Sequence, residues 1–252
     1  MVRDFYRKNF ERKHIINIKS INNVHISNRF EIFKGKRMKI NEPKITSLRE
    51  AGPLINQIIE LQALEQSAEG LKFSSDYLSG EDLSGIDYNC VEFDNCKLIG
   101  CDFSKAGFTN VYFKHCDISN CIFDSCYFNQ IEFISCKGVG SKFQNSTIKH
   151  VLINDGNFTY ANFEHSKFQK VLITTTNFSN AALAECILKE IELQKVIFNH
   201  CDFFKTPLKG IDFRDSDIDG IVLSDNYKEL VGAIVDTYQA AALARFLGVE
   251  VK

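Results

Sequence analysis

Large apolar residues recur at every fifth position over more than half of the chain. These positions run from Phe73 to Leu223 and number 31; Gly138 is the one exception, and 16 of the 22 phenylalanines fall on them. A period of five fits neither an α-helix, which repeats every 3.6 residues, nor a flat β-strand, which repeats every two. The chain is therefore expected to turn a corner every five residues, as a solenoid does.

A second register, made of small residues, supports this interpretation. Two positions before each large residue, from Ile86 to Ile221, stand only Ile, Val, Cys, Ala, Ser, Thr or Gly. One large and one small inward side chain per side fill a narrow coil. Eight of the nine cysteines occupy the small register, and Cys90 stands at an outward corner. We interpret the eight as core residues rather than a metal or redox ladder, because no histidine shares their register.

The repeats resemble those of the pentapeptide repeat proteins, whose unit reads roughly A/C-D/N-L/F-x-x. Segments 101–105 (CDFSK), 116–120 (CDISN) and 161–165 (ANFEH) match it closely. The resemblance implies an all-β solenoid, namely a right-handed quadrilateral parallel β-helix with four pentapeptides per coil. The 31 positions then make about eight coils.

We expect four parts along the chain. Residues 1–46 form a basic, disordered arm, residues 47–70 an N-terminal capping helix, residues 71–225 the β-helix, and residues 226–252 a C-terminal helix and short strand. The capping helix is predicted from about residue 53 to 68, with a capping box at Ser47–Glu50, Pro53 in its first turn and Gly70 as its stop. Asp76 and Glu81 replace small residues, which predicts a distorted first coil.

The arm carries a strong positive charge. Residues 1–40 hold 11 Lys or Arg against 3 Asp or Glu, although the whole chain has a formal net charge of −2. A solvated tail is the simpler interpretation, and nucleic-acid binding by residues 1–40 is the alternative. Met38 as the natural start is a further possibility. No segment is typical of a signal peptide or membrane span, which predicts a cytoplasmic protein.

The C-terminal segment from Asp236 to Gly248 is typical of a capped helix. Asp236 is the expected N-cap, Gln239 reaches back to it, and Gly248 ends the helix. Residues 249–252 alternate like a short strand. The segment either covers the last coil or forms a homodimer contact. The residues assigned to dimerisation are Tyr238, Ala242, Phe246, Leu247, Val249 and Val251.

This tail resembles the end of the quinolone-resistance (Qnr-type) pentapeptide proteins. The matching residues are Tyr238–Ala241 and Leu247–Val249, and the resemblance implies a dimer. Gly138 resembles the single-glycine interruption of that group, and we expect a local kink or bulge there, with a ligand pocket as the alternative. Unlike the Qnr proteins of Gram-negative bacteria, the chain has no room for a projecting loop between residues 73 and 223.

No catalytic site is expected. With four pentapeptides per coil, the four histidines of the repeat region fall on four different faces, and no phosphate-binding loop, dinucleotide fingerprint or GxSxG motif is present. Neither a cofactor nor a metal is therefore predicted. Aspartates that precede a large residue are expected to bond corner amides. Examples are Asp102, Asp117, Asp202 and Asp212.

Charge is sorted by face. One face carries five lysines: Lys149, Lys167, Lys170, Lys189 and Lys209. The face centred on Phe73, Phe93 and Phe113 is acidic, and its partner-binding residues are predicted to be Glu92, Asp94, Glu132, Asp155, Glu192, Asp212 and Asp215. The resemblance implies a DNA mimic that binds DNA gyrase or topoisomerase IV and protects it from quinolone-type inhibitors. The alternative is a scaffold for another protein that uses Leu152, Leu172 and Ile134.

Overall fold

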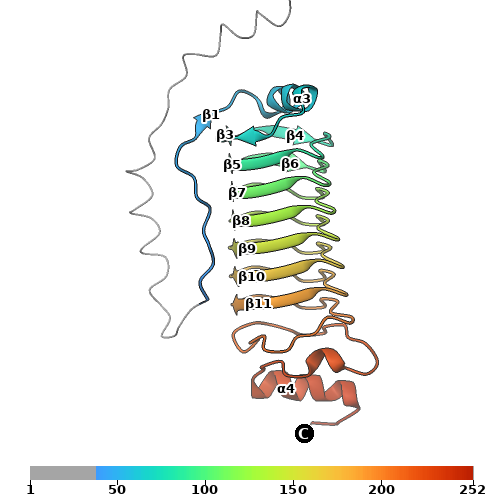
Figure 1. The fold of residues 1–252 in the computed structure, drawn as a ribbon. Helices are drawn as coiled ribbons and strands as arrows, with labels where there is room; N and C mark the ends of the chain where they lie inside the picture. Colours follow the sequence, from blue (N-terminus) through green and yellow to red (C-terminus); the bar gives the residue numbers. More distant parts are fainter. Residues whose placement is uncertain (1–37, 252) are drawn as a thin grey trace, which may run out of the picture.

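The computed structural model describes residues 38–251, which form a parallel β-solenoid of about seven turns with a helix at its C-terminal end (Figure 1). The main sheet has the order β1-β3-β5-β7-β8-β9-β10-β11, with β2 beside β5, and β4 pairs with β6. The strands are β1 (Arg49–Glu50), β2 (Ala68–Glu69), β3 (Leu71–Ser74), β4 (Tyr77–Ser79), β5 (Asp87–Asp94), β6 (Lys97–Ile99), β7 (Gly107–Lys114), β8 (Tyr127–Ile134), β9 (Thr147–Asn154), β10 (Lys167–Thr174) and β11 (Ile187–Gln194).

The number of turns is smaller than the eight that the sequence predicted. Extended strand pairing ends at Gln194, and beyond it isolated bridges such as Ile197 with Asp217 hold successive layers together. Of the basic arm predicted for residues 1–46, residues 1–37 lie outside the described residues.

Each turn of the solenoid takes four pentapeptides, as the repeat predicted. Phe93 pairs with Phe113 and Phe113 with Phe133 in parallel register. The rings of Phe93 and Phe113 stack with centroids 4.9 Å apart, as do those of Phe113 and Phe133. The large residues therefore form vertical columns inside the coil, and they exclude water from the hydrogen-bonded ladders around them.

The small register supplies hydrogen-bond donors as well as small volume. Many of its hydroxyl and thiol groups donate to the carbonyl oxygen of a large residue on the previous turn. Examples are Ser146 Oγ to Phe123 O at 2.8 Å, Thr206 Oγ1 to Leu183 O at 2.6 Å and Cys186 Sγ to Phe163 O at 3.0 Å. Burial raises the pKa of the Cys186 thiol to about 12, so the thiol keeps the proton that it donates. The cysteines are core residues, as predicted, with a polar role that the sequence interpretation missed.

The corners of the coil share one backbone conformation. Every fifth residue from Ser75 to Gly210 has a positive φ angle, between 50° and 80°. This left-handed conformation suits Gly and Asn, which recur at these positions. The predicted aspartate bonds are confirmed, because each of the four carboxylates accepts from the backbone N–H two residues later. The distances are 2.8 Å for Asp102, 3.0 Å for Asp117, 2.8 Å for Asp202 and 3.1 Å for Asp212.

The kink or bulge predicted at Gly138 is wrong. The register continues through this position, since Lys137 bridges both Asp117 and Asn157, and Gly138 N donates to Asn157 O at 2.8 Å. The Phe158 ring from the next turn fills the space instead: a Cβ atom on Gly138 would lie 2.6 Å from its Cε1 atom. The ring also stands at 84° to that of Phe133, which shows how the core repacks around the missing side chain.

The N-terminal helix α3 (Leu54–Leu64) is shorter than predicted, and its end signals differ. The Ser47–Glu50 capping box is wrong, because Arg49 and Glu50 form strand β1 on Leu71 and Lys72. The Asp76 carboxylate instead accepts from Leu54 N at 3.0 Å, in the first turn of α3. Glu65, in left-handed conformation, ends the helix rather than Gly70. Leu54 and Ile58 of α3 are buried against the first coils.

The C-terminal region follows the prediction more closely. The coil gives way to the short 3₁₀ helix η2 (Lys228–Leu230), then to helix α4 (Thr237–Ala244) and η3 (Arg245–Leu247). Asp236 and Gln239 form the predicted capping box. Gly248 ends η3 with φ 74°. The short strand predicted at residues 249–252 is absent from residues 249–251, which lie beside no other strand.

Replacing Tyr88 by Phe is expected to stabilise the protein. Tyr88 stands in the column of Phe108 and Phe128, and its buried hydroxyl has no hydrogen-bond partner among the described residues. Because a buried unpaired hydroxyl loses its hydration without a replacement bond, Tyr88→Phe should raise the free energy of unfolding by about 1 to 3 kcal/mol in urea titrations. Tyr160→Phe is the control, since Tyr160 is 66% exposed. A destabilised Tyr88→Phe variant would contradict this interpretation of the core.

Replacing Gly138 by Ala is expected to destabilise the protein. The added methyl group collides with the Phe158 ring, so the free energy of unfolding should fall by about 1 to 3 kcal/mol. Gly52→Ala is the matched control, because a Cβ atom there meets nothing within 4 Å. Adding Phe158→Leu to Gly138→Ala should recover part of the loss, and equal stability of the two glycine variants would contradict the prediction.

Candidate functional site

The acidic residues predicted to bind a partner occupy two different environments. Glu92 in β5, Glu132 in β8 and Glu192 in β11 belong to one column of outward-pointing side chains, which we call the outer column. Glu92 and Glu132 are only 8% and 9% exposed. The remaining four acidic residues lie at strand ends and corners. In order along the solenoid, the outer column consists of Glu92, Tyr112, Glu132, Leu152, Leu172 and Glu192.

Glu92 is held by two lysines from the neighbouring turns. Lys72 Nζ lies 3.0 Å from Oε1 and Lys114 Nζ 2.6 Å from Oε2. Burial alone raises the pKa of Glu92, but the hydrogen bonds and charges of Lys114 and Lys72 outweigh it and hold the pKa below its usual value. The carboxylate is therefore charged and internally neutralised, and it contributes little negative potential to the surface.

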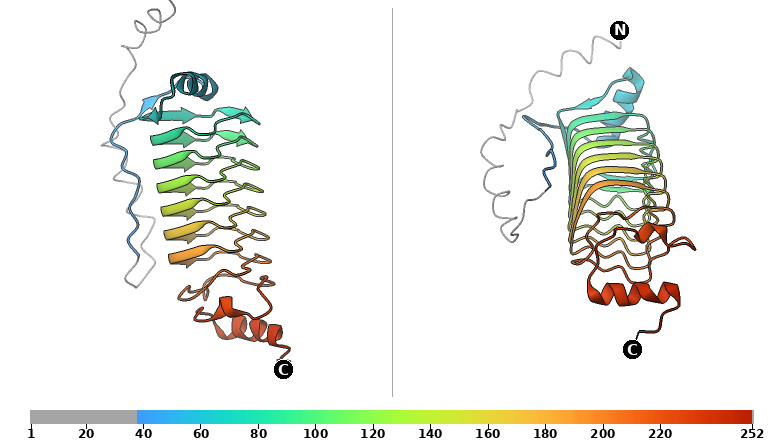
Figure 2. Two further views of the ribbon diagram at one scale, coloured as in Figure 1. Left: turned by 45° about the vertical axis from the view of Figure 1, so that its right-hand side comes forward. Right: turned by 60° about the horizontal axis from the view of Figure 1, so that its bottom comes forward.

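A segment from the N-terminal side of the chain crosses the strands along the solenoid axis. We call this segment, Met38–Ser47, the N-terminal strap; it runs beside the strands from the level of β11 up to β1 (Figures 1 and 2). Three of its N–H groups donate to solenoid side chains on alternate turns. The bonds are Met38 N to Glu192 Oε2 at 2.9 Å, Asn41 N to His150 Nδ1 at 3.2 Å and Lys44 N to Asn110 Oδ1 at 2.9 Å.

Solenoid side chains also donate to strap carbonyl groups. Gln130 Nε2 donates to Glu42 O at 3.0 Å, and Cys90 Sγ lies 3.6 Å from Lys44 O. Four of the five partners stand in one column of left-handed corner residues, which we call the corner column: Cys90, Asn110, Gln130 and His150. The fifth, Glu192, belongs to the outer column beside it.

The outer column is apolar where the strap passes from Glu192 to His150. Leu152 and Leu172 point away from the core, since Val151, Ile153, Val171 and Ile173 point inward, yet both leucines are only 7% exposed. They are also not part of the core cluster. From the sequence, both leucines were predicted to be exposed; the structure corrects this prediction, because both are buried. Ile134 is half-buried.

The other acidic residues remain accessible. Asp155 is exposed and accepts from Ser135 Oγ at 2.8 Å, and Asp215 is exposed in the same corner position three turns later. Asp212 binds its neighbour Arg214, with 2.7 Å between Oδ2 and Nη2. Asp94 lies 3.3 Å from Lys72 Nζ. Of the seven predicted residues, Asp155 and Asp215 are thus the two with exposed carboxylates that form no ion pair within residues 38–251.

Four of the five lysines of the basic face, Lys149, Lys167, Lys189 and Lys209, lie on the other side of the corner column, and Lys170 continues the column itself, one turn after His150. Lys149 lies in β9, Lys167 and Lys170 in β10, and Lys189 in β11, each on the first half of its strand or at its bend. Burial lowers the pKa of His150, and the charge of Lys170 lowers it further. The strap therefore lies along the border between a lysine-rich and a carboxylate-rich surface.

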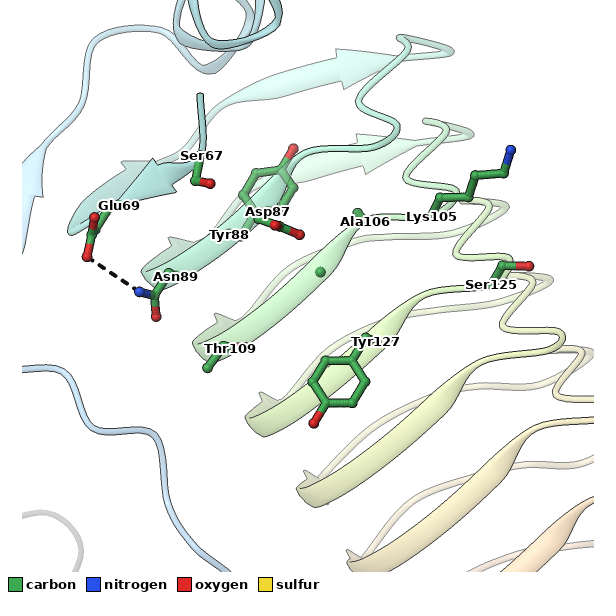
Figure 3. A pocket seen from close by; sticks show the side chains of 11 residues that line it. Ser67, Glu69, Asp87, Tyr88, Asn89, Lys105, Ala106, Thr109, Ser125 and Tyr127 are labelled. Atoms are coloured by element: carbon green, nitrogen blue, oxygen red, sulfur yellow. Dashed lines mark hydrogen bonds between the residues drawn. The ribbon is translucent and has the colours of Figure 1, made fainter. Parts of the chain in front are cut away.

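An open hollow of about 490 Å³ lies at the N-terminal end of the basic face (Figure 3). Gly107 is one of its lining residues and stands between Asp87 and Tyr127 in successive strands. The Asp87 side chain lies over Gly107, since a Cβ atom there would collide with Asp87 Oδ1. Asn89 Nδ2 donates to Glu69 Oε1 at its rim, at 3.4 Å. The described residues that line the hollow present polar and apolar surface in about equal parts.

The C-terminal residues assigned to dimerisation are mostly exposed. Tyr238 is 88% exposed, Leu247 70%, Val249 49% and Val251 53%, and Ala242 is also exposed. Phe246 differs, because its ring packs on Tyr227, with centroids 5.6 Å apart. Gln239 Nε2 donates to Phe213 O at 2.9 Å and Ser216 O at 2.7 Å, which fastens α4 to the last coil.

The histidines are dispersed, as the repeat predicted. His115, His150, His165 and His200 occupy four different corner columns, each with a positive φ angle. Within residues 38–251 no group of three or more His, Cys, Asp or Glu side chains is placed to hold a metal ion. Over the same range, no helix has the length and apolar character needed to cross a membrane.

Comparison with known proteins places the repeats in a known class. A family model described as a pentapeptide repeat region matches residues 86–163, and one described as pentapeptide repeats (8 copies) matches residues 176–215. No curated protein matches the chain.

Solved structures also match. Two are structures of QnrB1, titled a plasmid-mediated fluoroquinolone resistance protein: a trypsin-treated variant (26% identity, TM-score 0.38) and the full-length protein (23% identity, TM-score 0.35). Each match covers 73% of this chain and 91% of the other. A third is HetL, titled a pentapeptide repeat protein involved in heterocyst differentiation regulation, from the cyanobacterium Nostoc (12% identity, 73% and 98% coverage, TM-score 0.26).

Replacing Glu92 by Gln should destabilise the protein in a pH-dependent way. At about pH 7 the loss of the charged hydrogen bonds to Lys72 and Lys114 is expected to lower the free energy of unfolding by about 1 to 3 kcal/mol. Because the folded-state pKa is below the unfolded value, this contribution is present above the ordinary carboxyl pKa and is lost as the pH falls through the folded-state pKa.

Urea unfolding at a series of pH values between about 7 and 3 measures the difference between the two proteins. Glu60→Gln, on the exposed side of α3, serves as the control and should change stability by less than about 0.5 kcal/mol. A difference for Glu92→Gln that stays constant down to acid pH would show that the ion pairs are not its cause.

Proposed function

Since the chain is a pentapeptide repeat protein, we propose that it is a non-enzymatic binding protein that binds a type II topoisomerase, DNA gyrase or topoisomerase IV, and protects it from quinolone-type inhibitors. The observation that carries the proposal is the fixed placement of exposed carboxylates along a straight rod. Asp155 and Asp215 stand in one corner position three turns apart, about 14 Å at 4.8 Å per turn. A DNA-binding groove is built to neutralise such spaced negative charge.

The C-terminal helix supports the same target. Its sequence resembles the Qnr-type tail at Tyr238–Ala241 and Leu247–Val249, and its capping box and Gln239 bonds give it one defined position on the last coil. The exposed apolar residues of the tail fit a second copy of the chain. We therefore propose a homodimer joined through α4 and residues 247–251, with Phe246 supporting the helix from behind. The proposal places the protein in the cytoplasm with its target.

The structure changes which acidic residues carry the proposal. Glu92 and Glu132 are buried, and Glu192 accepts a bond from the strap, so reversing their charge would disturb the fold. Asp155 and Asp215 are exposed and, over the described part of the chain, accept no bond from the strap, so their charge can be reversed without this disturbance. Lys195 lies between them at the same position of the repeat with φ 52°, so a lysine is compatible with the left-handed conformation of Asp155, and Asp215 is not among the residues with a positive φ angle.

Supercoiling by DNA gyrase in the presence of a fluoroquinolone tests the proposal. The protein is expected to restore supercoiling at a suitable molar ratio, and Asp155→Lys/Asp215→Lys should need at least about tenfold more protein, since each reversal replaces attraction to a basic groove by repulsion. Glu60→Lys/Glu81→Lys is the control, because both residues are exposed near the N-terminal end and the change in net charge is the same.

Failure of the unchanged protein to restore supercoiling at any ratio, with gyrase and with topoisomerase IV, would overturn the proposed target. Equal loss in both double variants would show a general effect of net charge rather than a binding surface. The scaffold alternative is favoured by one observation, the docking of a chain segment along the corner column and the outer column. A pull-down that returns no topoisomerase would support it.

A further inference from the structure

The spacing of the hydrogen-bonding N–H groups along the strap matches the spacing of turns along the solenoid. Asn41 N and Lys44 N lie three positions apart along the strap, and their acceptors His150 and Asn110 lie two turns apart in the corner column. Met38 N, three positions before Asn41, reaches Glu192, two turns beyond the level of His150. Three strap residues thus span two solenoid turns, twice in succession.

The agreement has a simple geometric origin. Two turns of the solenoid rise about 9.6 Å at the spacing of neighbouring strands. Three residues of an extended polyproline-type chain rise about 9.3 Å and complete one turn, so every third N–H group points the same way. A peptide of this shape therefore presents one donor to the corner column at every second turn without stretching.

The strap is separable from the solenoid. Among the described residues, five hydrogen bonds join the strap backbone to solenoid side chains, and four of them are exposed. Backbone pairing with the sheet begins only after the strap, where Arg49 N donates to Gly70 O. Each solenoid turn keeps its own ladder whether the strap is present or not, so detachment is a local opening rather than unfolding.

The surface under the strap requires a cover. Leu152 and Leu172 point outward and are buried, and the strap turns Ile40, Pro43 and Ile45 away from solvent while its polar residues stay exposed. Exposed apolar patches of this kind are typical of binding surfaces. The occupant that fits is an extended peptide with apolar side chains at intervals of two or three residues and a free N–H at every third position.

We propose that the outer column and the corner column together form a binding surface for an extended peptide, that residues 38–47 occupy it in the same chain, and that a partner segment of the same backbone period displaces them. The surface recognises backbone N–H groups at two-turn intervals and apolar side chains between them. This proposal does not rest on topoisomerase binding.

Proline substitutions in the full-length chain test the proposed register. Asn41→Pro and Lys44→Pro, combined, remove the two N–H groups that bond His150 and Asn110 but keep an extended backbone. Glu42→Pro is the matched control, since no hydrogen bond from the Glu42 N–H is found among the described residues and its carbonyl stays available to Gln130. Far-UV circular dichroism and thermal unfolding establish that the solenoid is intact in each variant.

Cys90 reports whether the strap is docked. Its thiol faces Lys44 O under the strap, whereas the other eight cysteines are buried in the core. With a disulfide reagent such as dithiobis(nitrobenzoate), Asn41→Pro/Lys44→Pro should raise the rate of Cys90 modification at least about tenfold, and Glu42→Pro should leave it within about twofold. Equal rates in the unchanged protein and both variants would overturn the proposed register.

A synthetic peptide of residues 38–47 then tests binding in trans. It should slow Cys90 modification in the Asn41→Pro/Lys44→Pro protein, and calorimetry should show binding at least about tenfold tighter than to the unchanged protein, whose surface is occupied. A scrambled peptide should do neither. Asn110→Ala/Gln130→Ala, which removes the receptor side chains and leaves the strap sequence unchanged, should weaken peptide binding; no binding of the peptide to the opened protein would overturn the proposal.

Discussion

The structure depends on one constraint, which is that the backbone ladder between successive turns holds the same register from one turn to the next. Inside the coil, this register places each large side chain over the equivalent residue of the previous turn, and the ring stacks of Phe93, Phe113 and Phe133 follow from it. The small register is fixed in the same way, because a hydroxyl or thiol meets a carbonyl oxygen only when the turns stay aligned. Outside the coil, the same register sorts charge by face and places the four histidines of the repeat region in four different columns.

The periodic part of this fold could be predicted from the sequence because its contacts repeat. Aspartate bonds at Asp102 and Asp117 and the capping box at Asp236 are local, so a short stretch of sequence contains both partners. The errors concern contacts between distant residues. The Asp76 carboxylate accepts a hydrogen bond from Leu54 N in the first turn of α3, although the two residues are 22 positions apart. This bond takes the place of the capping box predicted at Ser47–Glu50. Phe158 fills the space at Gly138 from the following turn.

The candidate site was less predictable than the fold. Face assignment correctly grouped Glu92, Glu132 and Glu192, but sequence alone does not show which outward residues are covered. The N–H groups of the strap bond side chains 66 to 154 residues away, and the strap's own spacing of apolar residues is too irregular to be recognised as a repeat. The signal was present in the leucines of the outer column, since two apolar residues at outward positions on adjacent strands indicate a cover.

The equal height of every turn has a consequence for how such a molecule changes in length. Adding or deleting four pentapeptides within the coil lengthens or shortens the rod by one layer and leaves each side chain facing its former direction, whereas a single-residue insertion rotates everything beyond it into a wrong environment. A strap that spans several layers also limits how many whole layers can be added or deleted beneath it. Because three of its residues match two layers, an odd change in the number of layers beneath it leaves its donors between acceptors, and the rod and its covering segment can only be altered together.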